Sequence, residues 1–388
     1  MSRNRVIYQS EALYVSKDIN STTSAQHVEL DRIQSANYSF TINRQDINQF
    51  GELSRIGSVV LEPPTVNLDL TYYLTDGSNE RALNFHVRNT SANIDRTFLS
   101  GHMVSAYSGQ NFYILTTTEG NDVNNTTGDG ALGSAGAYAK SVIGIGNAYI
   151  TNYSLDASVG NLPTVSVSFE ASNINAATSI AYNTGNNFTG WSGASLASVD
   201  PTAGTVNAGV VLLPTGKTSL GNSSIIALRP GDIKLNIEQF DASESGIFVK
   251  VSGTTDAIHI QSAALAIPLA RTPIQRLGTR FAYSRPLDLP ASATLSVSAI
   301  VNEITAENLA SVLDSTFEKD ITITINAPGG AAAVVYTLKK CRLDSESFTS
   351  SIGANKTIDL VFSSQYASLT DTTRGVFMSG QSSNTIFS

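Results

Sequence analysis

Hydrophobic and polar residues alternate along several stretches of the chain, most clearly from Thr65 to Leu74. The side chains of a β-strand point alternately to the two faces of its sheet, so this pattern predicts a strand that is buried on one face. The same kind of pattern, bounded by turn residues, predicts further strands. They cover residues 6–15, 32–43, 112–117, 141–153, 164–172 and 206–213, and the strands 141–153 and 164–172 form a hairpin around Gly160 and Asn161.

The stretch around the clearest strand occurs twice. Moving the sequence by 227 positions places residues 33–80 on residues 260–307, with ten identities in 48 positions. The identical residues of the first copy are Ile33, Gln34, Ser35, Ala36, Arg44, Ile47, Gly51, Pro63, Leu68 and Glu80. The second copy of the strand, 293–301, keeps the phase of the first, whereas a slip by one residue would exchange its two faces. The repetition indicates two copies of one structural unit.

A second block repeats in the same order. Residues 149–169 fall on residues 342–362 with a shift of 193, and Ser154, Ser158, Gly160, Thr164 and Phe169 are identical in both copies. The two shifts differ by 34 (227 − 193), so the first copy holds about 34 extra residues between its blocks. A segment rich in Gly, Asn and Thr, at about 118–140, accounts for them.

These patterns predict a mainly β fold with two tandem, related β-sandwich or half-barrel domains, each with one short flanking helix. The first domain covers residues 1–174, a connecting arm or insertion covers 175–222, and the second domain with a polar tail covers 223–388. Ser78 is expected to cap the first helix, which runs to about Phe85. Thr305 stands at the matching place before the second helix, expected over 306–313.

Composition narrows the function classes. The formal net charge is −8 and only 14% of the residues are charged, which argues against a protein that holds nucleic acid by neutralising phosphates. The single cysteine, Cys341, excludes an intrachain disulfide, and its alignment with Ala148 predicts a small buried residue. The chain shows no signal peptide and no apolar run of about 20 residues. We expect a soluble protein made in the cytoplasm.

The residues that usually carry chemistry do not form a recognisable site. The histidines His27, His86, His102 and His259 are scattered, without the spacing of metal ligands. Gly216, Lys217 and Thr218 end like a phosphate-binding loop, but Val211 occupies the position of its first glycine. Gly144 and Gly146 lack a third glycine, because Tyr149 follows, and a calcium loop from Asp122 would need a glutamate where Gly133 stands. We expect no enzyme, no cofactor and no metal.

Three runs of the first copy resemble the major tail proteins, or tail tube proteins, of long-tailed bacteriophages. They are Arg32 to Ala36, Ile42 to Leu53 and Leu61 to Val66, and the opening Asn4 to Leu13 is similar to the same group. The resemblance covers about the first 90 residues, and beyond them it rests on the internal repeat.

The resemblance implies a structural virion protein. In such proteins six small β-domains close a ring around a wide lumen, and the rings stack through long loops. A chain with two domains would close the ring as a homotrimer with pseudo-sixfold symmetry. The implied partners are further copies of the chain, other tail proteins (tape measure, terminator and tip), and genomic DNA that passes during ejection without specific binding. The implied location is the virion tail, assembled in the host cytoplasm.

The resemblance also suggests interaction sites. The strand 65–74 and its echo would lie near the lumen or in the core, with acidic lumen side chains repelling the phosphate backbone. The long connections between strands, residues 45–64 and 272–292, would make ring-to-ring contacts. The candidate interaction residues are Arg44, Arg271, Gly51, Gly278, Pro63, Pro290, Phe50 and Leu277. For Arg44 and Arg271 two interpretations stay open, an interdomain salt bridge at matching seams or an exposed residue at a strand end.

Other readings compete with this one. A tail terminator, neck or capsid-decorating protein could use the same kind of sandwich, and negative-stain images distinguish long cylinders from small particles. A carbohydrate-binding adhesive protein could use tyrosines and Trp191 as stacking surfaces, which a glycan array would reveal. An enzyme is the least supported reading, since the catalytic constellations are missing.

Overall fold

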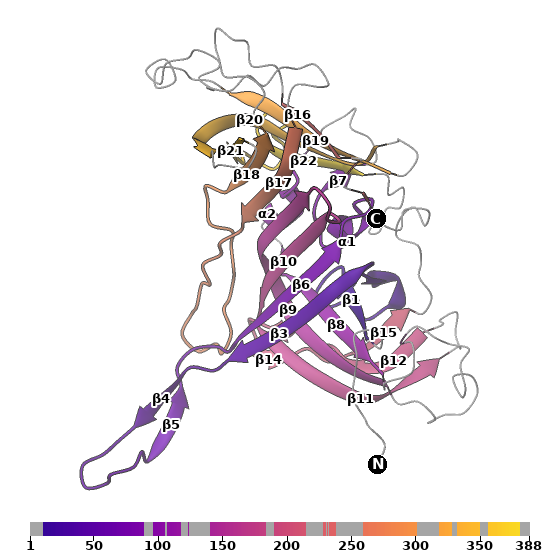
Figure 1. Ribbon diagram of the computed structural model, residues 1–388. Coiled ribbons are helices and arrows are strands. Elements are labelled where there is room, and N and C mark those ends of the chain that lie inside the picture. Colours follow the sequence, from indigo (N-terminus) through magenta and orange to yellow (C-terminus); the bar gives the residue numbers. More distant parts are fainter. Residues whose placement is uncertain are drawn as a thin grey trace, which may run out of the picture.

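The computed structural model in Figure 1 describes most of the chain. The described residues are 11–88, 96–104, 107–117, 123, 140–183, 190–214, 228–229, 231, 233–237, 259–300, 318–327, 332–349 and 356–380. The helix expected at 306–313, most of the insertion at 118–140 and the end of the polar tail lie outside these residues. The mainly β character predicted from the sequence is confirmed.

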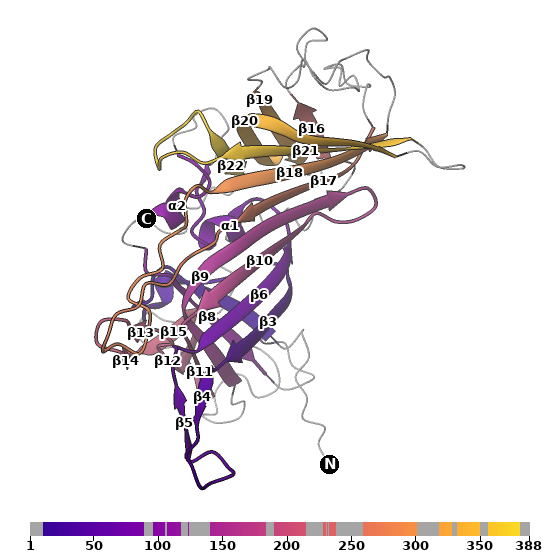
Figure 2. The same ribbon diagram turned by 90° about the vertical axis from the view of Figure 1, so that its left-hand side faces the viewer.

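Eight antiparallel strands form one continuous sheet, the long sheet. In order across it they are β3 (Ile33–Thr41), β6 (Thr65–Tyr73), β10 (Thr164–Ala171), β9 (Lys140–Ser158), β17 (His259–Pro268), β18 (Ser292–Ile300), β21 (Thr357–Gln365) and β20 (Ala332–Thr349). Figure 2 shows these strands following one another across the molecule. Four come from residues 11–183, the first half, and four from residues 233–380, the second half.

A second layer of strands belongs to each half. In the first half it comprises β2 (His27–Glu29), β1 (Glu11–Ser16), β8 (Gln110–Thr116), the start of β9, and β11 (Asn173–Asn183). In the second half β16 (Ile233–Ile237), β19 (Lys319–Asn326), the start of β20, and β22 (Gly375–Gly380) are arranged in the same way. β22 also pairs in parallel with β7 (Val87–Arg88), which ties the two halves together.

The remaining elements are short. β12 (Gly190–Ser195) and β15 (Val210–Pro214) continue from β11, β13 (Val199–Asp200) pairs with β14 (Thr205–Val206), and β4 (Arg44–Ile47) pairs with β5 (Gly57–Val60). The helices are α1 (Ser78–Ala82), α2 (Ser100–Met103) and the 3-10 turn η2 (Ser24–Gln26). The sequence placed the connecting arm from residue 175, but residues 173–177 of β11 pair with β9 and extend the second layer of the first half.

The longest strands, β9 and β20, each take part in both layers. Their first parts pair with β8 and β19, and their later parts pair with β10 and β21. At the change of layer Asn147 in β9 and Lys340 in β20 have φ of 53° and 56°. Positive φ is uncommon for these residue types, and it interrupts the regular pleat where the strand leaves one layer for the other.

The strand registers repeat between the halves. Ile33 pairs with Tyr72 and Ile260 with Ala299, as a shift of 227 requires. In β10 and β21, Val165 pairs with Leu155 and Ile358 with Phe348, as a shift of 193 requires. The irregularities before Ser35 and Ser262, and after Ser168 and Val361, also fall at matching places.

Alternation along the strands positions the hydrophobic core as the sequence predicts. In β6 the residues Val66, Leu68, Leu70 and Tyr72 are fully buried, whereas Asn67 and Asp69 between them are exposed. The same pattern runs through β18 and β21, so one face of the long sheet packs on the core and the other carries polar side chains. A separate cluster under β12 and β15 buries Trp191.

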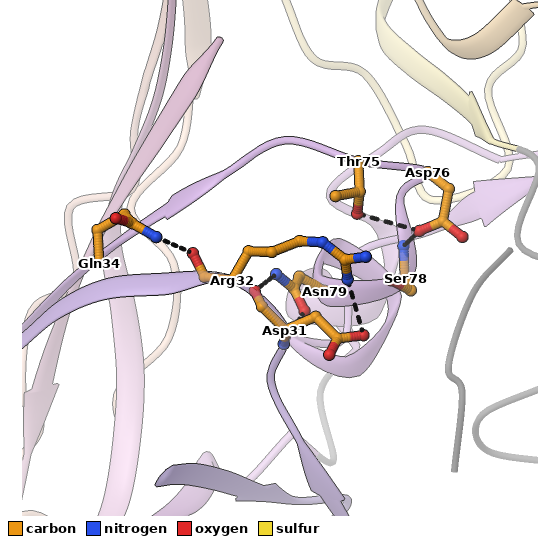
Figure 3. Close-up of polar contacts among 7 residues, drawn as sticks. All are labelled: Asp31, Arg32, Gln34, Thr75, Asp76, Ser78 and Asn79. Atoms are coloured by element: carbon orange, nitrogen blue, oxygen red, sulfur yellow. Dashed lines mark hydrogen bonds and ion pairs between the residues drawn. The ribbon is translucent and has the colours of Figure 1, made fainter. Parts of the chain in front are cut away.

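The expected flanking helix is present in the first half, but it is shorter than predicted and starts differently. Ser78 is the first helical residue and Gly77, at φ 84°, is the N-cap. The cap position therefore belongs to a glycine, and the Asp76 carboxylate accepts the Ser78 N–H instead (3.2 Å; Figure 3). Asn79 then exchanges two hydrogen bonds with the Asp31 backbone, which fixes the start of β3 against α1.

Candidate functional site

The two halves meet at one junction in the middle of the long sheet, between β9 and β17. Leu155 pairs with Leu265 and Tyr153 with Ile267, and all four side chains are buried. The junction is thus an antiparallel ladder with an apolar row behind it, like the other strand pairs of the sheet. We call it the internal seam.

Arg271 anchors the segment that follows β17 to the first half. Its Nε donates to the Ile150 carbonyl at 3.3 Å and its Nη2 to the His102 carbonyl at 3.3 Å. The guanidinium carbon lies 5.6 Å and 5.3 Å from the ring centroids of Tyr107 and Tyr149, within the range of a cation–π contact. Burial, with the Arg271 charge next to it, lowers the pKa of His102 to about 3, so this imidazole is neutral.

An ion pair lies next to Arg271 and holds the same segment against the first half. Arg285, which is buried, pairs with Glu170 on β10. The Arg271 Nη1 also donates to the Arg285 carbonyl at 2.9 Å, so the two arginines hold one another in place. Arg271 therefore lies where the second half contacts the first, and the hydrogen bonds of its guanidinium go to carbonyl oxygens rather than to a carboxylate.

A buried carboxyl group connects three strands of the core. Tyr72 donates a hydrogen bond of 2.8 Å to Glu80 Oε1, and Tyr153 donates one of 3.3 Å to the same oxygen. The Tyr153 hydroxyl lies 2.7 Å from that of Tyr336, which comes from the second half. Burial raises the pKa of Glu80 to about 7, against the opposing effect of the tyrosine hydrogen bonds. Asp76 contributes a further small rise.

The ends of the long sheet are unpaired edges within the described part of the chain. β3 pairs with β6 on one side only, and residues 342–349 of β20 pair only with β21. A strand edge presents unpaired N–H and C=O groups to any further strand. Among the described residues, each half thus leaves one edge of the long sheet unpaired, and we call these the free edges.

Apolar side chains are exposed along both free edges. Tyr38 and Phe40 on β3 are 43% and 57% exposed, whereas Leu265 and Ile267, their counterparts at a shift of 227, are buried in the internal seam. Phe348 on β20 is 47% exposed, whereas Leu155, its counterpart at a shift of 193, is buried. Each edge therefore leaves in solvent the positions that the internal seam covers.

The outer face of the long sheet is polar and made of small side chains. Its residues include Ser35, Asn37, Ser39, Asn67, Asp69, Thr71, Ser154, Asp156, Ser158, Ser166, Ser168, Ser262, Ala264, Ala266, Thr294, Ser296, Ser298, Ser347, Thr349 and Asp359. The charged members of this set are aspartates. The same registers also place Glu170, which pairs with Arg285, and Arg342, which pairs with Glu318, on this face. Acidic side chains therefore outnumber basic ones on it, which disfavours the binding of polyanions.

The other candidate interaction residues lie on the connections between β3 and β6 and between β17 and β18. Phe50 and Leu277 project fully into solvent at matching hairpin tips, next to Gly51 and Gly278 with φ of 92° and 88°. These left-handed positions explain why both copies keep a glycine there. Arg44 is exposed on β4, Pro63 is half-buried, and Pro290 is exposed. The structure does not bring the first-copy and second-copy residues together.

No protein-family model and no curated protein matches this sequence. Neither helix in the described part of the chain has the length and apolar character needed to cross a bilayer. Within the same residues, His, Cys, Asp and Glu side chains do not gather in groups of three that could hold a metal ion.

Sequence reasoning missed the residues at the edges. Tyr38 and Phe40 occupy hydrophobic positions in the segment 32–43, where alternation alone does not distinguish an edge strand from an inner one, and no role was predicted for Phe348 from the sequence. The repeat could have pointed to them, because it aligns Tyr38, Phe40 and Phe348 with Leu265, Ile267 and Leu155, which lie in the internal seam. A seam between two copies needs one edge from each, and the two unused edges then remain at the ends.

Proposed function

We propose that this chain is a structural protein of a bacteriophage tail, which closes into rings with copies of itself and stacks into the tube that conducts the genome. The exposure of apolar residues on both free edges carries the proposal. Half-exposed aromatic side chains on long, flat edges favour self-association, and ring closure removes the edges altogether.

In the proposed ring, β20 of one chain pairs with β3 of the next, and we call this contact the joint. Its register is taken from the internal seam. Leu155 and Leu265 are paired at the internal seam. The shift of 193 places Phe348 at the position of Leu155, and the shift of 227 places Tyr38 at the position of Leu265. Phe348 of one chain would therefore pair with Tyr38 of the next. Covering each of these rings would stabilise the joint by about 1 kcal/mol, since each is roughly half-buried already. In the same register Glu346 stands opposite Phe40.

The repeated registers support a duplicated domain. The matches in the long sheet continue into the second layers, where Leu13 pairs with Ile114 in the first half and Leu235 with Ile323 in the second. With two equivalent halves per chain, three chains would supply the six domains of a pseudo-sixfold ring. Duplication also makes alternate joints intrachain, which raises the effective concentration of the joined domains.

The polar outer face supports a conducting role. If this face lines the lumen, its aspartates repel the phosphate backbone and its small side chains leave DNA without tight contacts. Purified rings at physiological salt are then expected to retain no DNA. Salt-sensitive DNA binding by the rings would contradict a conducting lumen.

Negative-stain images of the purified protein test the proposal. Rings or hollow cylinders with threefold or sixfold appearance are expected, and a protein that stays monomeric at high concentration would overturn it. Phe348→Asp should prevent closure while the circular dichroism spectrum stays unchanged. Val206→Asp is the matched control, because Val206 is exposed to a similar degree on β14, away from both edges.

The register has its own test. Ser39→Cys with Ser347→Cys, in a Cys341→Ala background, should form a disulfide between chains, because their counterparts Ala266 and Ser154 are directly paired. Ser35→Cys with Ser347→Cys is displaced by four residues, about 13 Å along the strand, and should not. Equal cross-linking of both pairs would reject the joint.

A further inference from the structure

Two hairpins of the same design follow β3 in the first half and β17 in the second. In the first, Arg44 pairs with Val60 and Ile47 with Gly57. In the second, isolated bridges join Arg271 to Leu287 and Ile274 to Ser284, the same register at a shift of 227. We call the first hairpin, residues 44–60, the arm.

The two hairpins differ in what they contact. The second is held against the first half by the Arg271 hydrogen bonds and by the Arg285–Glu170 pair. Arg276 also holds it against the segment between the halves, because its Nη2 donates to the Thr202 carbonyl at 3.2 Å. The arm projects away from the body of the molecule, as Figure 1 shows for β4 and β5. Among the described residues, the second hairpin therefore packs on its own chain whereas the arm does not.

The exposed surface of the arm is largely apolar. Its exposed side chains include Ile47, Phe50, Leu53, Ile56, Val59 and Val60. A two-stranded hairpin by itself is marginally stable in water, and a run of exposed apolar residues marks a contact surface. The arm is therefore built to lie against another molecule.

The surface that the second hairpin contacts indicates, through the repeat, the surface that the arm would contact. Arg271 corresponds to Arg44, and Ile150, whose carbonyl it binds, corresponds to Leu343 on β20 at a shift of 193. β20 is exposed from Arg342 to Thr349 except at partly covered Leu343 and Glu346, whereas the matching residues of β9 are buried or half-buried except Asp156. This half of β20 carries two acidic residues, Asp344 and Glu346, whose charges complement Arg44, and its one arginine, Arg342, pairs with Glu318.

We propose that the arm docks on a second copy of this chain, against the exposed half of β20, with Arg44 donating to the Leu343 carbonyl of that copy. The inference rests on the proposed function, since the second copy is the one joined through β3 and β20. It places the base of the arm at the joint between neighbours in one ring, where the sequence led us to expect a ring-to-ring contact.

Photo-crosslinking tests the surface that the arm would contact. A benzophenone maleimide on Gln45→Cys, in the Cys341→Ala background, is irradiated in a mixture of 15N-labelled and unlabelled full-length chains. Hybrid crosslinked peptides should contain residues 342–349. Crosslinks that fall within one chain, or on any other surface of the second copy, would overturn the proposal.

A pair of arginine variants tests the anchoring contact. Arg44→Ala should raise the concentration needed for assembly about tenfold, because a charge-assisted hydrogen bond is lost. Arg55→Ala is the matched control: Arg55 lies on the same arm but pairs with Asp46 of the arm itself, at 2.9 Å. Equal effects of the two substitutions would count against the Arg44 contact.

The Ser39–Ser347 disulfide, measured in the same samples, separates this inference from the proposed function. If the disulfide forms and the benzophenone reacts elsewhere, the arm proposal fails and the ring joint stands. If hybrid crosslinks reach 342–349 without the disulfide, the arm docks but the edge pairing is wrong. If neither forms, both proposals are wrong.

Discussion

The buried carboxyl group of Glu80 makes stability depend on pH in a way that can be calculated. Its pKa rises from an ordinary 4.5 to about 7 in the folded protein, because burial penalises the charged form. The folded state therefore binds the proton more tightly than the unfolded state between these values. Stability contributed by the neutral group is complete below pH 4.5 and is lost as the pH rises through about 7.

The size of the loss follows from the shift. A rise of roughly 2.5 units at about 1.4 kcal/mol per unit corresponds to roughly 3 kcal/mol. Glu80→Gln keeps the shape and an acceptor for the Tyr72 hydroxyl but cannot ionise. The variant should therefore gain about 3 kcal/mol relative to the parent chain between pH 4.5 and pH 7.5.

Urea unfolding of both proteins across this pH range measures the difference directly. With an unfolding entropy of roughly 2 cal/mol/K per residue, the same difference amounts to about 4 °C in Tm. Glu62→Gln is the control for the substitution itself, because Glu62 is exposed on the segment after the arm. A stability difference between Glu80→Gln and the parent chain that does not change with pH would refute the burial argument.

Three further predictions concern packing and reactivity. Leu265→Ala in the internal seam should destabilise the protein by about 2–5 kcal/mol, measured by urea unfolding. Gly146→Ala should destabilise it strongly, because a Cβ there would lie 2.1 Å from the Ala197 carbonyl oxygen, whereas Gly57→Ala meets open space and should be tolerated. Burial raises the pKa of Cys341 to about 12, so its thiol should react with a disulfide reagent at pH 8 only after unfolding.

The strands and their registers could be predicted from the sequence because the information is local. A period of two fixes which residues of a strand face the core, and the repeat then fixes the register of the matching strand. The helix start was less certain, since Ser, Asp and Gly near one another all favour caps and turns. Asp76 accepts the Ser78 N–H, and Gly77 supplies the left-handed backbone.

The contacts between distant segments could not be read in the same way. The repeat gives Arg271 and Arg44 the same aligned position, yet Arg271 is anchored on β9 and Arg44 lies exposed. The difference depends on what stands beside each strand, which a single-strand pattern does not encode. The α2 helix escaped prediction for a related reason, since its four residues show no period.

The sharing of β9 between the two layers has a consequence for local opening. A peptide N–H exchanges with solvent only when the hydrogen bonds around it break, and regions that open independently exchange early. β9 hydrogen-bonds to β8 and β11 along its first part and to β10 and β17 along the rest, so neither layer can peel away while it stays in place. Its amide protons should be among the last to take up deuterium, and the two layers of the first half should lose protection together.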